Sequence, residues 1–81
     1  MLMTLASQIV PLDLLAAGET ARVFEVDGRA EFVHRLHEMG LQPGAEVRML
    51  RPGSPCILAV NEHRLSFRLE DSTTVLVEVS R

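Results

Sequence analysis

A short stretch of the chain carries the side chains best able to bind a metal ion. His34 and His37 lie three residues apart, and Glu38 follows directly. Residues three and four apart on a helix are neighbours, so two imidazoles and one carboxylate could meet a single divalent cation. The same spacing is common on an ordinary solvated helix face, and an ion bridging two molecules would use it equally well. We therefore expect at most weak divalent metal binding at these residues, and no required cofactor.

The other reactive side chains do not form a catalytic group. Cys56 is the only cysteine, so it cannot form a disulfide within the chain, and its alternation with Leu58 predicts a place in the core. His63 is expected at one end of a barrel strand. The 81 residues contain no Ser/His/Asp or Cys/His arrangement and no glycine-rich phosphate loop. The sequence therefore predicts a protein that is not an enzyme.

One amphipathic helix is predicted over residues 29–39, and it carries both of the paired histidines. Its apolar residues recur at helical spacing: Phe32, Val33, Leu36 and Met39. We expect Leu36 and Met39 to pack in the core rather than to anchor a partner. Gly40 suits the position after a helix that requires a positive φ, and Leu41 can then fold back on the last turn.

A tight turn is predicted directly after this helix. Gln42-Pro43-Gly44 places proline second and glycine third in a type II turn. Gly40, Pro43 and Gly44 together form what we call the elbow. Each fits a backbone φ value that few other residue types adopt easily. We expect a structural role for the elbow, which sets how the helix is presented.

Five short strands are predicted around the helix. Turn residues separate them, and they span residues 20–26, 47–50, 56–60, 65–69 and 74–79. Residues 11–18 are predicted to form a short helical turn with Pro11 at its start and Gly18 at its end. The fold class is therefore mainly β: a small closed or nearly closed five-stranded barrel, with one helix inserted after the first strand.

A two-residue hairpin at Asn61-Glu62 would join the third and fourth strands. This register places two sets of side chains on one face: Cys56, Leu58 and Val60 with Phe67, Leu65 and His63.

The charge pattern argues against a nucleic-acid partner. The chain has eight arginines, no lysine and eleven acidic residues, and its net charge is −3. No basic run is available to neutralise phosphates, and three phenylalanines without tyrosine or tryptophan offer few stacking surfaces for bases or proline-rich peptides. No apolar run approaches the ~18 residues of a membrane span, and no basic residue precedes Arg22 as in a signal peptide. We expect a soluble cytoplasmic protein without direct membrane insertion.

Three segments of the sequence resemble the FeoA family of ferrous-iron transport accessory proteins. Residues 35–47, RLHEMGLQPGAEV, resemble the family's helix, glycine stop, Pro-Gly turn and strand. Residues 11–14 and 18–23 resemble its opening, and residues 60–67 resemble its fourth-strand hairpin. Two places depart from the family pattern, because the loop at residues 51–54 is short and Glu62 stands where glycine is common.

This resemblance implies an SH3-like barrel in the cytosol that binds the GTP-binding domain of the FeoB-type membrane permease. It suggests an FeoA-like domain over residues 11–81, after an N-terminal extension of residues 1–10. For the contact with the partner we expect the surface around the helix and the elbow: Arg35, Glu38, Gln42 and Arg48. The direction of the effect on transport and the formation of a homodimer are left open.

A second reading is a free-standing regulatory barrel related to the C-terminal domain of DtxR-type metal-dependent repressors, which shares this architecture. Residues 1–10 are too few for the helix-turn-helix region that normally precedes such a domain.

Overall fold

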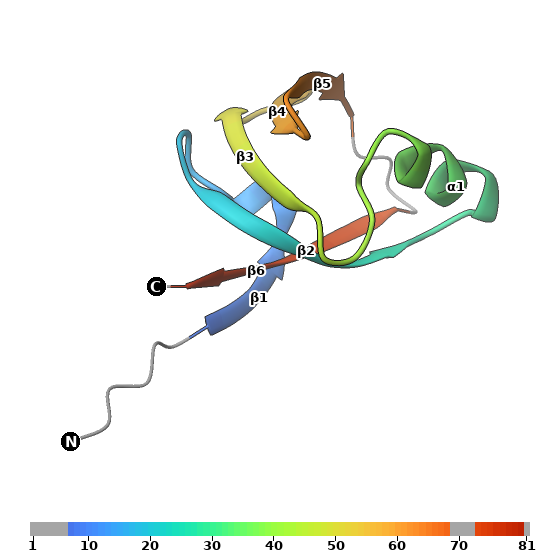
Figure 1. Cartoon of the computed structure of the whole chain (residues 1–81), viewed down its shortest axis with the longest axis horizontal. Coiled ribbons are helices and arrows are strands. Elements are labelled where there is room, and N and C mark those ends of the chain that lie inside the picture. The colour runs from blue at the N-terminus through green and yellow to red at the C-terminus, as the bar shows by residue number, and fades with distance from the viewer. Residues whose placement is uncertain (1–6, 69–72, 81) are drawn as a thin grey trace.

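The fold is built on antiparallel strands, with one α-helix beyond the end of β2 (Figure 1). The computed structural model describes residues 7–68 and 73–80, and within them the chain forms six strands. In chain order the elements are β1 (Ser7–Pro11), the 3-10 helix η1 (Leu12–Leu14), β2 (Thr20–Asp27), α1 (Ala30–Glu38), β3 (Glu46–Arg51), β4 (Cys56–Val60), β5 (His63–Phe67) and β6 (Thr74–Ser80). The strands lie in the order β1-β6-β2-β3-β4-β5.

The predicted count of five strands is wrong because β1 was missed. This strand begins within the expected N-terminal extension and pairs with β6, so that Ser7 lies opposite Ser80 and Pro11 lies opposite Leu76. Its partner is at the other end of the chain, and a local pattern of five residues does not reveal such a pairing. The helix consequently follows the second strand rather than the first.

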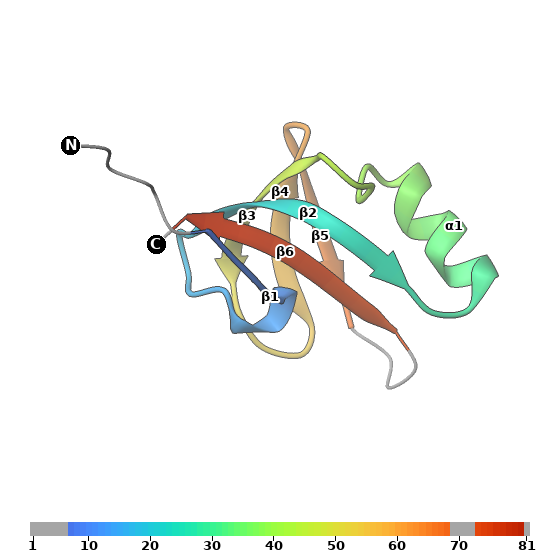
Figure 2. The same ribbon diagram turned by 90° about the horizontal axis from the view of Figure 1, so that it is seen from below.

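The sheet is open rather than closed. In the described part of the chain, β1 and β5 are the two edge strands and do not pair with each other. The sheet nevertheless curls strongly, as Figure 2 shows. Its register shifts between Val23 and Glu25 of β2 and between Met49 and Arg51 of β3. Such bulges increase the local twist and bend the strands, which lets a small sheet wrap around one core.

The β4–β5 hairpin has the register predicted from the sequence. Cys56 lies opposite Phe67, and Val60 lies opposite His63. Asn61 and Glu62 form the turn with φ values of 49° and 68°, and two consecutive positive values are typical of the two-residue type I′ turn. β5 starts at His63, two residues before the predicted strand, and Leu69 at the predicted end lies outside the described residues.

Gly18 does not end the first helical turn, contrary to the prediction. η1 ends at Leu14, and Leu15 already has extended dihedral angles. Gly18, with φ of 89°, instead lies in the turn before β2, where its N–H donates to the carbonyl oxygen of Met49 at 2.6 Å. The glycine therefore serves the entry into the sheet, because the chain must reverse there to run beside β3.

The core lies inside the curled sheet and is made of aliphatic side chains. Alternate residues of β6 point inward, and η1 and the end of α1 cover the rest. The buried apolar residues are Leu12, Leu15, Ala21, Val23, Leu36, Leu41, Val47, Met49, Cys56, Leu58, Val60, Val75, Val77 and Val79. Met39 is half-buried and packs against this core, as predicted.

Cys56 belongs to this core, as its alternation with Leu58 predicted. Its side chain is 4% exposed. Burial raises the pKa of the Cys56 thiol, and the negative charge of Asp13 raises it further, against the lowering effect of a backbone hydrogen bond. The thiolate, which is the reactive form, is therefore scarce in the folded protein.

We predict that Cys56 of the folded protein reacts slowly with a disulfide reagent at neutral pH, because both burial and the raised pKa oppose the reaction. In denaturing guanidinium the rate should rise by at least ~100-fold, since labelling of the native protein must await opening of the core. The measurement is the absorbance change of the released thiol. Equal rates in the two conditions would contradict the placement of Cys56.

Candidate functional site

The end of α1 is fixed by a glycine-dependent turn that returns the chain to the core. Gly40 has φ of 100°, and its N–H donates to the carbonyl oxygen of His37 at 3.0 Å. The N–H of Leu41 donates to the carbonyl oxygen of Leu36 at 2.9 Å. This is the Schellman arrangement expected from the sequence. Leu36 and Leu41 have no exposed surface, so the same turn that ends the helix also anchors it by apolar packing.

The next turn ties the chain to β2. The N–H of Ala45 donates to the carbonyl oxygen of Gln42 at 3.0 Å, and Gly44 has the positive φ of 92° expected in a type II turn. Gly44 and Val23 are joined by a backbone hydrogen bond of 2.8 Å, and a second one of the same length joins Val23 to Ala45. The guanidinium of Arg22 donates to the carbonyl oxygen of Gly44 at 3.1 Å. Hydrogen bonds with Arg22 and Val23 of β2 therefore hold the elbow against the sheet.

The three candidate metal ligands are not brought together. Nε2 of His34 lies 3.6 Å from Oε1 of Glu38, with the two side chains 77% and 68% exposed. Nε2 of His37 is buried and has no hydrogen-bond partner among the described residues. His37 lies one turn after Val33 on the half-buried side of α1, whereas His34 and Glu38 are exposed. In the described part of the chain, no group of three or more His, Cys, Asp or Glu side chains could hold a metal ion.

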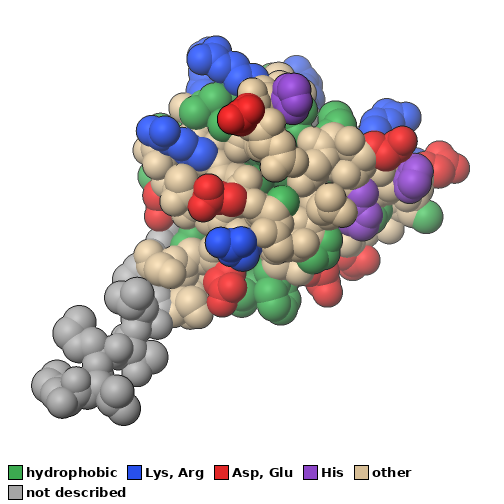
Figure 3. All heavy atoms as spheres, viewed as in Figure 1, with side chains coloured by type: hydrophobic (Ala, Val, Ile, Leu, Met, Phe, Trp, Pro, Cys, Tyr) green, Lys and Arg blue, Asp and Glu red, His purple; other side chains and the backbone are tan. Residues whose placement is uncertain are grey.

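The four residues expected to contact a partner are all exposed, but they lie on two different surfaces. Arg35 and Glu38 belong to α1, and Gln42 lies between Gly40 and Pro43 of the elbow. Arg48 lies in β3 opposite Thr20 of β2, so it belongs to the sheet. Figure 3 shows charged side chains of both signs and histidines gathered over the α1 end of the molecule.

A small hollow of about 160 Å³ lies on α1 and its N-terminal cap. Arg29, Glu31, Phe32 and Arg35 line it, so two guanidinium groups and one carboxylate surround a half-buried aromatic ring. Charged groups around an apolar centre are typical of surfaces that bind other proteins.

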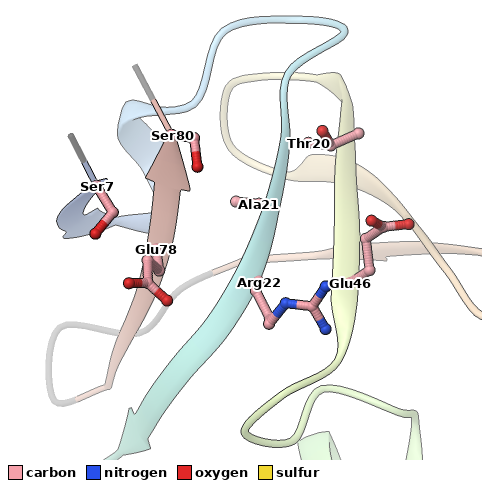
Figure 4. A pocket seen from close by; sticks show the side chains of 7 residues that line it. All are labelled: Ser7, Thr20, Ala21, Arg22, Glu46, Glu78 and Ser80. Atoms are coloured by element: carbon pink, nitrogen blue, oxygen red, sulfur yellow. The ribbon is translucent and has the colours of Figure 1, made fainter. Parts of the chain in front are cut away.

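A larger, shallow hollow of about 340 Å³ on the sheet was not predicted (Figure 4). Its charged residues come from three neighbouring strands: Glu78 of β6, Arg22 of β2 and Glu46 of β3. The alternating pattern of each strand shows that these side chains point outward. It does not show which strands are neighbours, and so the grouping could not be found from the sequence.

A model of the FeoA domain matches residues 10–79 of the chain. The FeoA protein from Chlorobium tepidum has a similar structure, with a TM-score of 0.77 and 30% sequence identity over 86% of this chain and 70% of that one. The zinc complex of FeoA from Stenotrophomonas maltophilia, a prokaryotic SH3 domain protein, gives a TM-score of 0.73 and 28% identity over 89% of this chain and 98% of that one.

A third similar structure is IdeR from T. acidophilum, with a TM-score of 0.74 and 19% identity over 99% of this chain and 37% of that one. At that identity the likeness shows a shared fold alone. No curated protein is similar enough to the chain to count as a relative. The match with the FeoA structures shows that the curled sheet has the SH3-like fold predicted from the sequence.

We predict that Gly40→Ala destabilises the protein more than Gly18→Ala. Both glycines have positive φ, which costs a residue with a side chain ~1–2 kcal/mol. A Cβ at Gly40 would also lie 2.8 Å from Nδ2 of Asn61 and 3.1 Å from Cγ1 of Val60, whereas a Cβ at Gly18 meets nothing within 4 Å. The clash should add ~1 kcal/mol, because the neighbours must shift.

Urea denaturation of both variants measures this difference in the free energy of unfolding. Because Gly18→Ala carries the same backbone penalty, it is the matched control. Equal losses of unfolding free energy in the two variants would show that the contact between the elbow and the β4–β5 turn does not affect stability.

Proposed function

Because the chain belongs to the FeoA domain family, we propose that it is a non-catalytic, cytoplasmic accessory protein of ferrous iron uptake that binds the GTP-binding domain of a FeoB-type permease. FeoA proteins are accessory proteins of ferrous iron transport and are not a known enzyme family. The observation that carries the proposal is the family match over residues 10–79 together with the shared SH3-like fold.

The described residues contain no helix long and apolar enough to span a bilayer. Action on a membrane permease through these residues would therefore be contact with a domain outside the bilayer.

The surface of α1 and the elbow is the docking site in this proposal. The Schellman turn and the hydrogen bonds to β2 hold this surface in one position, so little conformational entropy would be lost on binding. Arg35 and Glu38 expose charges of opposite sign one turn apart. Such a pattern favours one orientation of a complementary partner more than it adds affinity. Any effect on GTP hydrolysis would act through the partner's own active site.

We predict that the chain binds the isolated cytosolic domain of the permease in at least one nucleotide state, as measured by calorimetric titration without nucleotide, with GDP and with a non-hydrolysable GTP analogue. Arg35→Glu should weaken binding by roughly 3- to 10-fold, because reversing a charge at the contact converts attraction into repulsion.

Arg64→Glu on β5 is the matched control, since it makes the same change at an exposed residue of an edge strand. The affinity of this variant for the permease domain should equal that of the unchanged protein. Absence of heat in all three nucleotide states would overturn the proposal, and equal losses in both variants would reject α1 as the contact.

We also propose that His34 and Glu38 bind a divalent cation weakly, which the zinc complex of the S. maltophilia relative supports. Two side chains leave coordination positions for water or for a second molecule, so the affinity should lie far below that of a three- or four-ligand zinc site. We expect Zn²⁺ binding in calorimetric titration to be lost in His34→Ala and kept in His63→Ala. Unchanged binding in His34→Ala would reject this pair as the ligands.

A regulatory barrel related to the C-terminal domain of DtxR-type repressors is the alternative function. The fold likeness to IdeR is compatible with it, but the higher sequence identity to FeoA structures favours the permease partner. The titration with the permease domain separates the two readings, because a domain that serves a repressor would show no binding there.

A further inference from the structure

Arginines from two different strands meet on the outward side of β3, β4 and β5. Val47 and Met49 of β3 are buried, so Arg48 between them points outward. Arg48 lies opposite Ala59 of β4, and Ala59 lies opposite Arg64 of β5. Opposite residues share a face of the sheet, so the two arginines flank the small Ala59 on the outside.

A third arginine extends this cluster by one row. The register shift in β3 places Arg51 opposite Ile57, and Ile57 lies opposite Ser66 of β5. Ile57 stands between two buried residues of β4, so this row also points outward. Figure 3 shows blue side chains at the end of the molecule formed by β3, β4 and β5. We call these two rows the basic face: Arg48, Ala59 and Arg64 with Arg51, Ile57 and Ser66.

Among the described residues, no acidic side chain stands in either row of the basic face. Glu46 precedes the first row on β3, but it lies opposite Arg22, which is a cation. Glu62 lies in the β4–β5 turn, beyond the end of that row. The three arginines of the face are exposed, and none of them forms an ion pair within the described part of the chain. The face is therefore cationic, although the net charge of the chain is −3.

A hollow of about 320 Å³ adjoins the basic face at the β3–β4 loop. Arg51 and Ile57 line it together with residues 52–55. Ile57 and Leu50 are half-buried, so aliphatic surface lies beside the guanidinium groups. Arginines next to an apolar contact are typical of surfaces that bind other proteins. The basic face can therefore accept an apolar side chain beside anionic ones.

We propose that the basic face binds an acidic segment of a partner protein, with carboxylates at Arg48 and Arg64 and an apolar side chain in the hollow beside Arg51. Charge complementarity selects an acidic segment over a basic one. Neighbouring strands lie ~4.8 Å apart, so the Cα atoms of Arg48 and Arg64 are separated by about 10 Å. An extended segment of about three residues covers that distance.

Two other anionic partners fit the basic face less well. Anionic membranes are recognised by clusters of about 4–8 basic residues, which is more than the two rows contain. Single-stranded nucleic acid binds through aromatic side chains on which its bases stack, and neither row contains an aromatic residue. The aliphatic surface around Ile57 is more useful to a protein segment than to either of these partners.

This contact is separate from the one proposed for the permease and does not rest on it. Arg48 was expected beside Arg35, Glu38 and Gln42, but the structure places it on the sheet with Arg64 instead. The acidic segment therefore belongs outside the GTP-binding domain of the permease, toward which Arg64→Glu is expected to have no effect. The two proposals can thus fail independently.

The test uses the full chain and a short fluorescent peptide that alternates glutamate with leucine. Fluorescence anisotropy should show saturable binding that weakens as salt is added, because exposed charge pairs are screened. A matched peptide with glutamine in place of glutamate should bind at least ~10-fold more weakly, since it forms no charged pairs. Amide chemical shifts in NMR spectra should change in β3, β4 and β5 rather than in α1.

Single and double variants locate the site. Arg48→Gln and Arg64→Gln should each weaken binding of the acidic peptide roughly threefold, as expected for exposed charge pairs. The two positions are far enough apart to act independently, so the double variant should lose ~10-fold. Arg29→Gln is the matched control, because it makes the same change at an exposed arginine at the start of α1 and should leave the affinity unchanged. Circular dichroism melting curves verify that the variants fold.

Three outcomes would overturn the proposal. They are equal affinity for the glutamine peptide, chemical shift changes confined to α1, and equal affinity of the double variant and the unchanged chain. Vesicles of anionic lipid and a single-stranded oligonucleotide provide a further comparison. Tighter binding of the chain to either of them than to the acidic peptide would assign the basic face to that partner and would also overturn the proposal.

Discussion

The left-handed backbone at Gly40 is the constraint on which the rest of the molecule depends. It ends α1 and turns Leu41 into the core. The chain then continues to the turn at Gly44, which is hydrogen-bonded to β2. A helix of nine residues is too short to be stable alone in water, so its order comes from these attachments. Asn61 lies close to Gly40, so the end of α1 also contacts the β4–β5 hairpin. Gly40 thereby connects α1, β2 and this hairpin.

A small aliphatic core determines what kind of function such a chain can support. The buried residues are almost all hydrocarbon, and Cys56 behaves as one of them. Active sites usually contain buried polar groups without full hydrogen bonding, and burying such groups lowers the stability of the fold. A domain of this size is only marginally stable and tolerates few of them. Among the described residues the charged side chains lie outside, and Thr73 is the one buried polar residue. The partner binding proposed above would therefore use the outer surface of the protein.

Local features were predictable from the sequence, and features that depend on distant pairing were not. The Schellman turn at Gly40 and the register at Asn61-Glu62 are decided by a few neighbouring residues, so their residue types predict them. The pairing of β1 with β6 joins the two ends of the chain, and the strand count was wrong for that reason. The metal site stays a prediction, because helical spacing places His37 near His34 without showing that Nε2 of His37 is buried.

Pairing of the first and last strands has a practical consequence for engineering. Ser7 lies opposite Ser80, so the polypeptide enters and leaves the sheet at one edge, on the side away from α1 in Figure 1. A reporter or tether joined directly to Ser7 or Ser80 would thus start on the side away from the helix. A circularly permuted chain that joins Ser80 to Ser7 would need only a short linker, with new ends opened at the exposed turn of Asn61 and Glu62. The new termini would then lie beside the elbow. Attachment of the protein to a support through these termini would leave the β1 edge of the sheet facing the solution.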